Sequence, residues 1–331
     1  MAENKTRIAV LVQNELNLDL KEVFHEAVEM GAEIVNTPLY HTQDTAEVIQ
    51  AAKGFDYVVA GREPWNAEVL NACADHLKGI ARFGAGFETV DLETAASLGI
   101  AVCNAPGVNA KAVAEQALAL TLALLRKIAL YDRDLRDGGV TAKMTQTLEG
   151  TVALLGFGNI GCEFAKLLSV FPVKVIAYDP FPNYQAANAL GVEIVDLETA
   201  VKTADIISLH LPAVKNMKDF ICKETIAEMK DGVYIINTSR GYVVNEHDLV
   251  AGLRSGKIAG AALDAFKVEP FDPDSELKTL PNVVLTPHSA AVSTQAVRMV
   301  FQHCAGVIAD YMRGEDPRSL LNPNYALNRA E

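Results

Sequence analysis

Three residues in the C-terminal half of the chain have side chains that can bind and protonate a small acid. Arg240 follows the apolar run VYIINTS, His288 follows NVVLTP, and Glu269 lies between them in the chain. A planar guanidinium binds a carboxylate through two parallel hydrogen bonds. Histidine exchanges a proton near neutral pH, and a glutamate beside it can fix its tautomer. These residue types suit reduction of a 2-oxo acid, which needs a cation for the carboxylate and a proton donor for the carbonyl oxygen.

A glycine-rich turn in the middle of the chain has the pattern of a dinucleotide-binding loop. Gly156, Gly158 and Gly161 have GxGxxG spacing between the apolar run Thr151–Leu155 and the helical pattern Asn159–Leu168. The first glycine permits a tight turn, the second lets the backbone approach a pyrophosphate, and the third lets helix and strand pack closely. The first helical turn offers unpaired N–H groups to phosphate. This adds two candidate cofactor-binding residues, Asn159 and Ile160.

A carboxylate after the next strand indicates which dinucleotide is bound. The apolar run Lys174–Tyr178 is followed by Asp179, which can accept hydrogen bonds from the adenosine ribose hydroxyls. A carboxylate at this position repels a 2′-phosphate, and the next residues, Pro180 and Phe181, supply no arginine to bind one. The pattern therefore predicts NAD rather than NADP as the cofactor.

Each of these features also has an ordinary structural interpretation. A strand, a glycine turn and a helix can occur without a ligand, and Asp179 can be a surface acid. An arginine after a strand is often a solvated charge, a histidine after Thr-Pro is often a turn residue, and Glu269 precedes a proline as many surface acids do. Any one of the signals is weak alone, so their occurrence together is what favours the functional interpretation.

The elements that must position these residues alternate between strand and helix along the whole chain. This order predicts α/β architecture, with parallel sheets covered by helices on both faces. The predicted N-terminal strands are Arg7–Gln13, Asp56–Gly61, Lys78–Phe83 and Ile100–Asn104. The strands predicted further along, besides those named above, are Val192–Val195, Asp205–His210, Val233–Thr238, Ala259–Phe266 and Asn282–Thr286.

Three helices have clear sequence signals. A helix over Glu246–Ser255 has Asn245 as its N-cap and Gly256 as its stop. A last helix runs from Ser293 to Arg313. A third, Asn109–Leu130, is apolar nearly all round and must be buried. We expect residues 109–130 to form a homodimer interface.

Composition and charge exclude some classes of partner. The chain has 331 residues, and 29 basic residues stand against 42 acidic ones, which gives a formal net charge of −13. This charge argues against nucleic-acid or membrane binding, which depends on clustered Lys and Arg. The five cysteines are scattered without a CxxC or Cys/His cluster, so we expect no metal site and a cytoplasmic protein.

Four ordered motifs, GFGNIG, NTSRGYVVNEHDL, AALDAFKVEP and LTPHSA, resemble those of the NAD-dependent D-2-hydroxyacid dehydrogenases. The resemblance covers nearly the whole chain, and within the family the chain resembles the short form of D-3-phosphoglycerate dehydrogenase. It implies two lobes: a Rossmann-type doubly wound NAD domain over residues 105–291, inserted in a flavodoxin-like α/β substrate domain formed by residues 1–104 and 292–331.

The resemblance also implies roles for individual residues. Arg240, Glu269 and His288 match the family's catalytic arginine, glutamate and histidine. Asp264 matches an aspartate near the nicotinamide, where it would shape the cofactor site. Two further residues match positions beside the cofactor, His210 and Thr238. The chain departs from the family after His288, where Ser289-Ala290-Ala291 replaces the usual apolar residue and glycine or alanine.

Two loops of the first lobe are candidates for substrate binding. The turn Gly84-Ala85-Gly86 offers backbone N–H groups to a carboxylate, and Arg62 and Arg82 are candidates for a second anionic group such as phosphate. Alternatively, Arg62 pairs with Glu63 and Arg82 is structural. Trp65 either forms a wall of the substrate pocket or anchors the loop.

The substrate itself is not fixed by the motifs. 3-Phosphoglycerate is the first expectation, followed by glyoxylate or hydroxypyruvate. Formate or phosphite oxidation is less favoured, because formate dehydrogenases have glutamine where this chain has Glu269. A different class of function, an NAD-sensing protein that resembles the family's transcriptional corepressors, stays open at this point.

Overall fold

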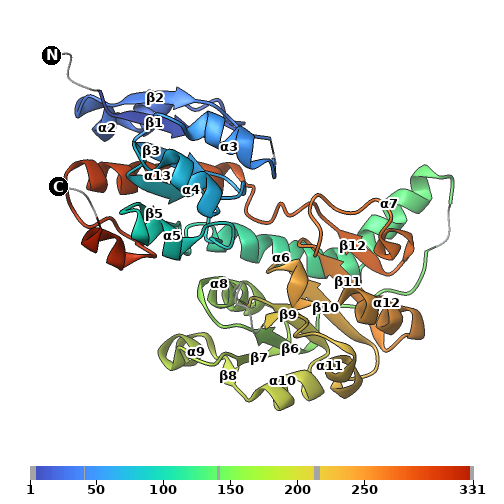
Figure 1. The fold of residues 1–331 in the computed structure, drawn as a ribbon. Helices are drawn as coiled ribbons and strands as arrows, with labels where there is room; N and C mark the ends of the chain where they lie inside the picture. Colours follow the sequence, from blue (N-terminus) through green and yellow to red (C-terminus); the bar gives the residue numbers. More distant parts are fainter. Residues whose placement is uncertain (1–4, 41, 140–141, 212–216, 329–331) are drawn as a thin grey trace. The chain divides into compact units, whose positions relative to one another are not determined.

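The structure, a computed structural model, describes residues 5–40, 42–139, 142–211 and 217–328 (Figure 1). The chain forms two units, which are described separately. Unit 1 comprises Met1–Asn109 and Ser293–Glu331, and unit 2 comprises Ala110–Val292. The sequence placed the corresponding boundaries after residues 104 and 291. The chain leaves unit 1 once, forms all of unit 2, and returns to unit 1 for its last helix.

Unit 1 is built on a parallel sheet. Its strands are β1 (Arg7–Val10), β2 (Glu33–Asn36), β3 (Tyr57–Ala60), β4 (Gly79–Arg82) and β5 (Ala101–Cys103). Their order is β2-β1-β3-β4-β5, and every pair is parallel. This is the strand order of flavodoxin-like folds, which confirms the predicted architecture of this lobe.

Helices cover both faces of the unit 1 sheet. They are α1 (Leu20–Val23), α2 (His25–Glu29), α3 (Thr45–Ala52), α4 (Ala67–Cys73), α5 (Leu92–Ser97), α13 (Thr294–Met312) and the 3-10 helix η4 (Pro323–Leu327). Apolar side chains of α2 and α13 pack on one face, and those of α3, α4 and α5 pack on the other. Side chains of Asp44, Asn66 and Asp91 cap α3, α4 and α5 by accepting hydrogen bonds from first-turn N–H groups.

Unit 2 is built on a second, larger parallel sheet. Its strands are β6 (Gly150–Leu155), β7 (Val173–Tyr178), β8 (Glu193–Ile194), β9 (Ile206–Leu209), β10 (Val233–Asn237), β11 (Ile258–Leu263) and β12 (Val283–Leu285). Their order is β12-β11-β10-β9-β6-β7-β8, with parallel pairing throughout. This is a doubly wound sheet, as the sequence predicted. The order in which successive strands are added reverses at β6, between its neighbours β7 and β9, while all strands stay parallel.

The register places the carboxyl ends of the unit 2 strands level with one another. Leu155 at the end of β6 pairs with Tyr178 of β7 and Leu209 of β9. Across the other half of the sheet, Leu263 of β11 pairs with Asn237 and Leu285. The residues that follow these strands therefore lie along one edge of the sheet.

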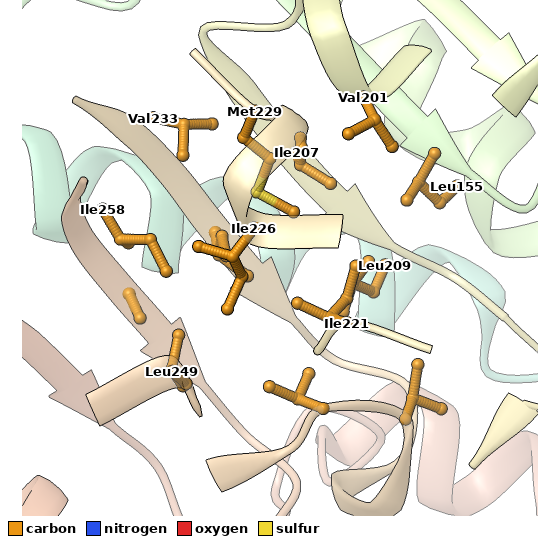
Figure 2. Close-up of a cluster of buried hydrophobic side chains, with 14 of the residues drawn as sticks. Leu155, Val201, Ile207, Leu209, Ile221, Ile226, Met229, Val233, Leu249 and Ile258 are labelled. Atoms are coloured by element: carbon orange, nitrogen blue, oxygen red, sulfur yellow. The ribbon is translucent and has the colours of Figure 1, made fainter. Parts of the chain in front are cut away.

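The unit 2 sheet also has helices on both faces. The helices are α6 (Ala110–Leu125), α7 (Ile128–Arg136), α8 (Asn159–Leu168), α9 (Tyr184–Leu190), α10 (Leu197–Thr203), α11 (Lys223–Glu228) and α12 (Glu246–Ser255), with the 3-10 helices η2 (Gly241–Val243) and η3 (Glu276–Thr279). Helices α6, α8 and α9 pack on one face. Side chains of α10, α11 and α12 pack on the other. Figure 2 shows part of this cluster, with Leu155 of β6 beside Val201 of α10 and with Ile207 and Leu209 of β9 near Ile226 of α11.

The predicted helix over residues 109–130 is wrong at its C-terminal end. Helix α6 ends at Leu125, and a separate helix, α7, begins at Ile128. Lys127 lies between them with φ 55°, in the left-handed region that ends helices. The break lies at the charged pair Arg126-Lys127, and the apolar residues that resume at Ile128 continue the pattern of a single helix beyond it.

Candidate active site

Two of the three catalytic candidates, His288 and Glu269, are in direct contact. Nδ1 of His288 lies 2.7 Å from Oε1 and 2.8 Å from Oε2 of Glu269. The backbone N–H of Phe266 donates to Oε1 at 3.1 Å and so holds the carboxylate in place. Both side chains are about three-quarters buried. A carboxylate at this distance orients the ring with the proton on Nδ1, which directs acid–base chemistry through Nε2.

Arg240 lies in a turn after β10 that its neighbours hold firmly. Asn237 accepts hydrogen bonds from the backbone N–H (2.9 Å) and hydroxyl (2.7 Å) of Ser239, and its amide donates to the carbonyl of Arg240 at 3.0 Å. Gly241 packs against the backbone of Phe266, where a Cβ atom would overlap the carbonyl carbon. The Arg240 turn therefore abuts the loop that carries Glu269. Sequence reasoning missed Asn237, although an asparagine at the end of a buried strand was the available signal.

The glycine-rich turn has the geometry that its motif predicts. Gly156 has φ 102°, and a Cβ there would collide with the carbonyl of His210. A Cβ on Gly161 would collide with the carbonyl of Gly156, which explains the close packing of α8 on the turn.

The start of α8 has room and donors for an anion. Gly158 is the N-cap of α8, no side chain caps this helix end, and the Cβ position of Gly158 is open space. Asn159 and Ile160 form the first turn. An uncapped helix N-terminus beside open space suits the pyrophosphate of a dinucleotide.

Asp179 lies beside the glycine-rich turn and bonds to it. Its Oδ2 accepts a hydrogen bond from the backbone N–H of Phe157 at 2.8 Å, and Oδ1 accepts one from Phe181 at 2.8 Å. Each carboxylate oxygen has two lone pairs, so these contacts are compatible with further bonds to ribose hydroxyls. The side chain is held in place before any ligand arrives.

We predict that Asp179→Ala weakens NAD binding about 10–100-fold and NADP binding far less, because charged hydrogen bonds contribute about 1.5–3 kcal/mol. Binding of both dinucleotides is measured by fluorescence titration. Asp196→Ala is the control, since Asp196 caps the distant helix α10 through Thr199. An equal loss of affinity for NAD and NADP in Asp179→Ala would contradict the predicted role of Asp179.

His210 follows β9 directly, and its side chain is partly buried. Nε2 lies 3.0 Å from the Ser208 hydroxyl, and the ring packs edge-on against Phe164 of α8 at 5.5 Å between centroids. Nδ1 is buried without a hydrogen-bond partner among the described residues. Burial lowers the pKa of His210 to about 4, so the imidazole is neutral near neutral pH.

This lowered pKa predicts acid sensitivity. In the unfolded chain His210 is protonated below about pH 6.5, whereas in the folded chain it is protonated only below about pH 4. The free energy of unfolding therefore decreases as pH falls from about 6.5 to about 4. The decrease reaches about 2 kcal/mol at pH 5. Urea unfolding at pH 7 and pH 5 should show a smaller pH effect in His210→Gln. The control His247→Gln, whose side chain is 89% exposed, should behave like the parent protein. An unchanged pH effect in His210→Gln would contradict the prediction.

Thr238 and Asp264 lie at the same edge of the sheet. Thr238 follows β10, and its buried Oγ1 has no hydrogen-bond partner among the described residues. An orphaned hydroxyl at this edge is what a ligand group would satisfy. Asp264 follows β11 and is fully buried, where its carboxylate binds the segment that carries His288.

In unit 1, the burial of Arg82 argues against its predicted role. Only 6% of its surface is exposed, and Nη1 donates to the carbonyls of Ala60 at 3.3 Å and Phe83 at 2.9 Å. Nearby Glu63 is also buried, and burial raises the pKa of its carboxyl against the opposing effect of the Arg82 charge. These contacts favour a structural role for Arg82.

The remaining unit 1 candidates lie on two loops. Arg62 is exposed after β3, and Gly84 has φ 130° at the start of its turn. Asn104 donates to the carbonyl of Ala85 at 2.7 Å, which fixes the turn before Gly86. Trp65 is fully buried, and its Nε1 donates to the Glu63 carboxylate at 3.1 Å, so it anchors the loop.

The described residues contain neither a cluster of three or more His, Cys, Asp or Glu that could hold a metal ion nor a helix long and apolar enough to cross a membrane.

Comparison with known proteins identifies the family. The family model described as "D-isomer specific 2-hydroxyacid dehydrogenase, NAD binding domain" matches residues 118–290. A hydroxypyruvate reductase from Thermotoga maritima is 42% identical over 73% of this chain and 80% of its own length. A D-3-phosphoglycerate dehydrogenase from Archaeoglobus fulgidus is 38% identical over 80% of this chain, which spans about half (51%) of that relative's length.

A solved structure supports the same assignment. The apo-structure of D-lactate dehydrogenase from Escherichia coli matches with a TM-score of 0.82 and 28% identity, covering 96% of this chain and 100% of that one. Together with the family model, these matches cover both units. The chain therefore belongs to the D-isomer specific 2-hydroxyacid dehydrogenases, oxidoreductases that act on CH–OH groups with NAD, and it contains their NAD-binding domain.

Proposed function

We propose that this chain transfers a hydride between NAD(H) and a 2-oxo acid/D-2-hydroxy acid pair, with Arg240, Glu269 and His288 acting at the reacting end. The observation that carries this proposal is the contact of His288 Nδ1 with both oxygens of Glu269, at 2.7 and 2.8 Å. The Arg240 turn abuts the same loop through Gly241.

The proposed reaction divides the work among these side chains. NADH supplies the hydride to the carbonyl carbon when it is bound. Arg240 binds the substrate carboxylate through its planar guanidinium. Protonated His288 donates its Nε2 proton to the carbonyl oxygen as negative charge develops there, and Glu269 stabilises the imidazolium through Nδ1. In the oxidation direction, neutral His288 accepts the proton of the substrate hydroxyl.

The unit 1 residues bear on the choice of substrate. The bonds of Arg82 to backbone carbonyls favour a structural role for it, which makes Arg62 the stronger arginine candidate for a phosphate group. We therefore propose hydroxypyruvate, which has no phosphate, as the substrate, with glyoxylate next. The phosphorylated alternative is 3-phosphoglycerate, which is favoured by the exposed Arg62 and by the similarity to the Archaeoglobus fulgidus enzyme.

A substrate panel tests the proposal. NADH oxidation is followed with hydroxypyruvate, glyoxylate, pyruvate and 3-phosphohydroxypyruvate, and the product configuration is determined. We expect hydroxypyruvate to have the highest kcat/KM. If Arg62→Gln lowers kcat/KM only for 3-phosphohydroxypyruvate, this result would instead support 3-phosphoglycerate as the substrate. Failure of every 2-oxo acid to oxidise NADH would overturn the proposed function.

We further propose that the chain forms a homodimer through the region of α6 and α7. Ile128 and Leu135 of α7 are 58% and 69% exposed, and their spacing of two helical turns places both apolar side chains on one face of the helix. Sedimentation equilibrium should report a dimer, and Ile128→Lys with Leu135→Lys should weaken it. A monomer at micromolar concentration would contradict the proposal.

A further inference from the structure

We propose that Asn104, which follows β5, is a positioning residue for substrate binding: it fixes the turn Gly84-Ala85-Gly86 so that two backbone N–H groups face the carboxylate of the 2-oxo acid. This inference rests on the proposed function, because the turn affects turnover only if the chain binds such an acid. The residues that carry it all belong to unit 1. The sequence indicated the turn as a candidate and assigned no role to Asn104.

The turn Gly84-Ala85-Gly86 has two backbone donors that the protein leaves available. Among the described residues, no acceptor takes the N–H of Ala85 or the N–H of Gly86. The turn is half-buried, so these donors are partly shielded from water. Successive backbone N–H groups in a turn form a concave site for an anionic group. The turn therefore suits a carboxylate.

Contacts with the end of β5 set the direction of these donors. The side-chain amide of Asn104 donates to the carbonyl of Ala85 at 2.7 Å, and the N–H of Ala105 donates to the carbonyl of Gly84 at 2.9 Å. A planar trans peptide points its C=O and the N–H that follows in opposite directions. Because both carbonyls are bound, the N–H groups of Ala85 and Gly86 are directed away from Asn104.

Asn104 is itself held in one place. Only 7% of its surface is exposed. Its carbonyl accepts a hydrogen bond from the Ser319 hydroxyl at 2.6 Å and lies 2.8 Å from Nε2 of His303 on α13. A residue anchored in this way fixes the orientation of the turn before the substrate arrives, which lowers the entropic cost of binding.

An amide is the side chain that this position requires. The partner of the side chain is the Ala85 carbonyl oxygen, which needs a donor, and an ionised carboxylate of the same size has none. Asn104→Asp therefore places a carboxylate oxygen against the carbonyl and replaces attraction by repulsion. Asn104→Ala removes the donor without the repulsion, so it should displace the turn less.

The test measures the kinetics of hydroxypyruvate reduction in both variants. The carboxylate is present in the substrate and in the transition state alike, so weaker binding of it raises KM and leaves kcat nearly unchanged. We expect KM to rise about 10–100-fold in Asn104→Asp, the usual effect of losing a hydrogen bond to a charged group, and to rise less in Asn104→Ala. The dissociation constant of NADH should stay the same, because the glycine-rich turn belongs to unit 2.

The matched control is Asn322→Asp, which makes the same chemical change at another residue beside β5. Asn322 is 3% exposed, accepts from the N–H of Val102 at 2.8 Å and donates to the carbonyl of Ile100 at 2.9 Å. This variant should lower the urea midpoint of unfolding, as Asn104→Asp does, and keep the KM of the parent protein. A KM in Asn104→Asp no higher than in Asn322→Asp, or a loss confined to kcat, would overturn the positioning role.

Binding of oxamate, a 2-oxo acid analogue whose carbonyl resists hydride transfer, tests the turn without turnover. Calorimetric titration of the NADH-bound protein should give an affinity about 10–100-fold lower in Asn104→Asp than in Asn322→Asp. This result separates two failures. If no 2-oxo acid is reduced and oxamate binding still depends on Asn104, the proposed function fails and the positioning role stands. If the affinity for oxamate is the same in both variants, the positioning role fails.

Discussion

Replacing His288 with asparagine is expected to lower turnover in 2-oxo acid reduction by about 10²–10⁴-fold, the usual contribution of a positioned general acid. Hydride addition leaves negative charge on the carbonyl oxygen, and asparagine can donate a hydrogen bond but no proton. NADH binding should persist, because His288 follows β12 and the glycine-rich turn follows β6, in different parts of the sheet. Steady-state kinetics and NADH fluorescence titration measure the two effects separately.

A second histidine on the same unit provides the control for this substitution. His247 lies on α12 with an exposed side chain. His247→Asn should retain full turnover. If His288→Asn also retains near-normal turnover, another group supplies the proton and the acid–base assignment is wrong.

Arg240→Lys is expected to cost about 1–3 kcal/mol in transition-state stabilisation, or about 5–150-fold in kcat/KM. Lysine keeps the positive charge but loses the planar fork that binds a carboxylate with two hydrogen bonds. The turn itself should survive, since Asn237 and Gly241 hold its backbone. The loss should therefore appear in kcat/KM for the 2-oxo acid and not in NADH affinity.

Arg254→Lys is the matched control for the arginine substitution. Arg254 is an exposed residue of α12 that pairs with Glu276 at 2.6 Å. Its replacement should leave kcat/KM unchanged. An Arg240→Lys variant as efficient as Arg254→Lys would remove Arg240 from substrate binding.

Strong local signals in the sequence predicted the elements of unit 2 closely. Helix α8 begins at Asn159 directly after the glycine-rich turn, and α12 lies between its cap Asn245 and the left-handed Gly256, as predicted. Strand β2 (Glu33–Asn36) was missed, because only its two central residues, Ile34 and Val35, are apolar, and they lie between the exposed Glu33 and Asn36. Caps and glycine stops are local chemistry, whereas a short edge strand depends on its neighbour β1.

The candidate site was predictable where one residue type decides the chemistry. The sequence predicts that Glu269 binds the imidazole of His288, and the two side chains are in contact. The burial of Arg82 was not predictable from the sequence, because an arginine at the end of a strand such as β4 could equally bind a ligand. The structure shows that its guanidinium donates hydrogen bonds to backbone carbonyls. The contacts of Asp264 with Ala290 were also beyond the sequence, since they depend on the register of β11 and β12.

The pH dependence of hydroxypyruvate reduction in the parent protein and in Glu269→Gln tests the central claim most directly. Reduction needs the protonated imidazole of His288, so the rate falls as pH rises through its deprotonation. Glutamine keeps a hydrogen bond to Nδ1 but removes the negative charge that stabilises the imidazolium. The account predicts that the falling limb of kcat/KM moves to lower pH in Glu269→Gln. A falling limb at the same pH in both proteins would contradict it.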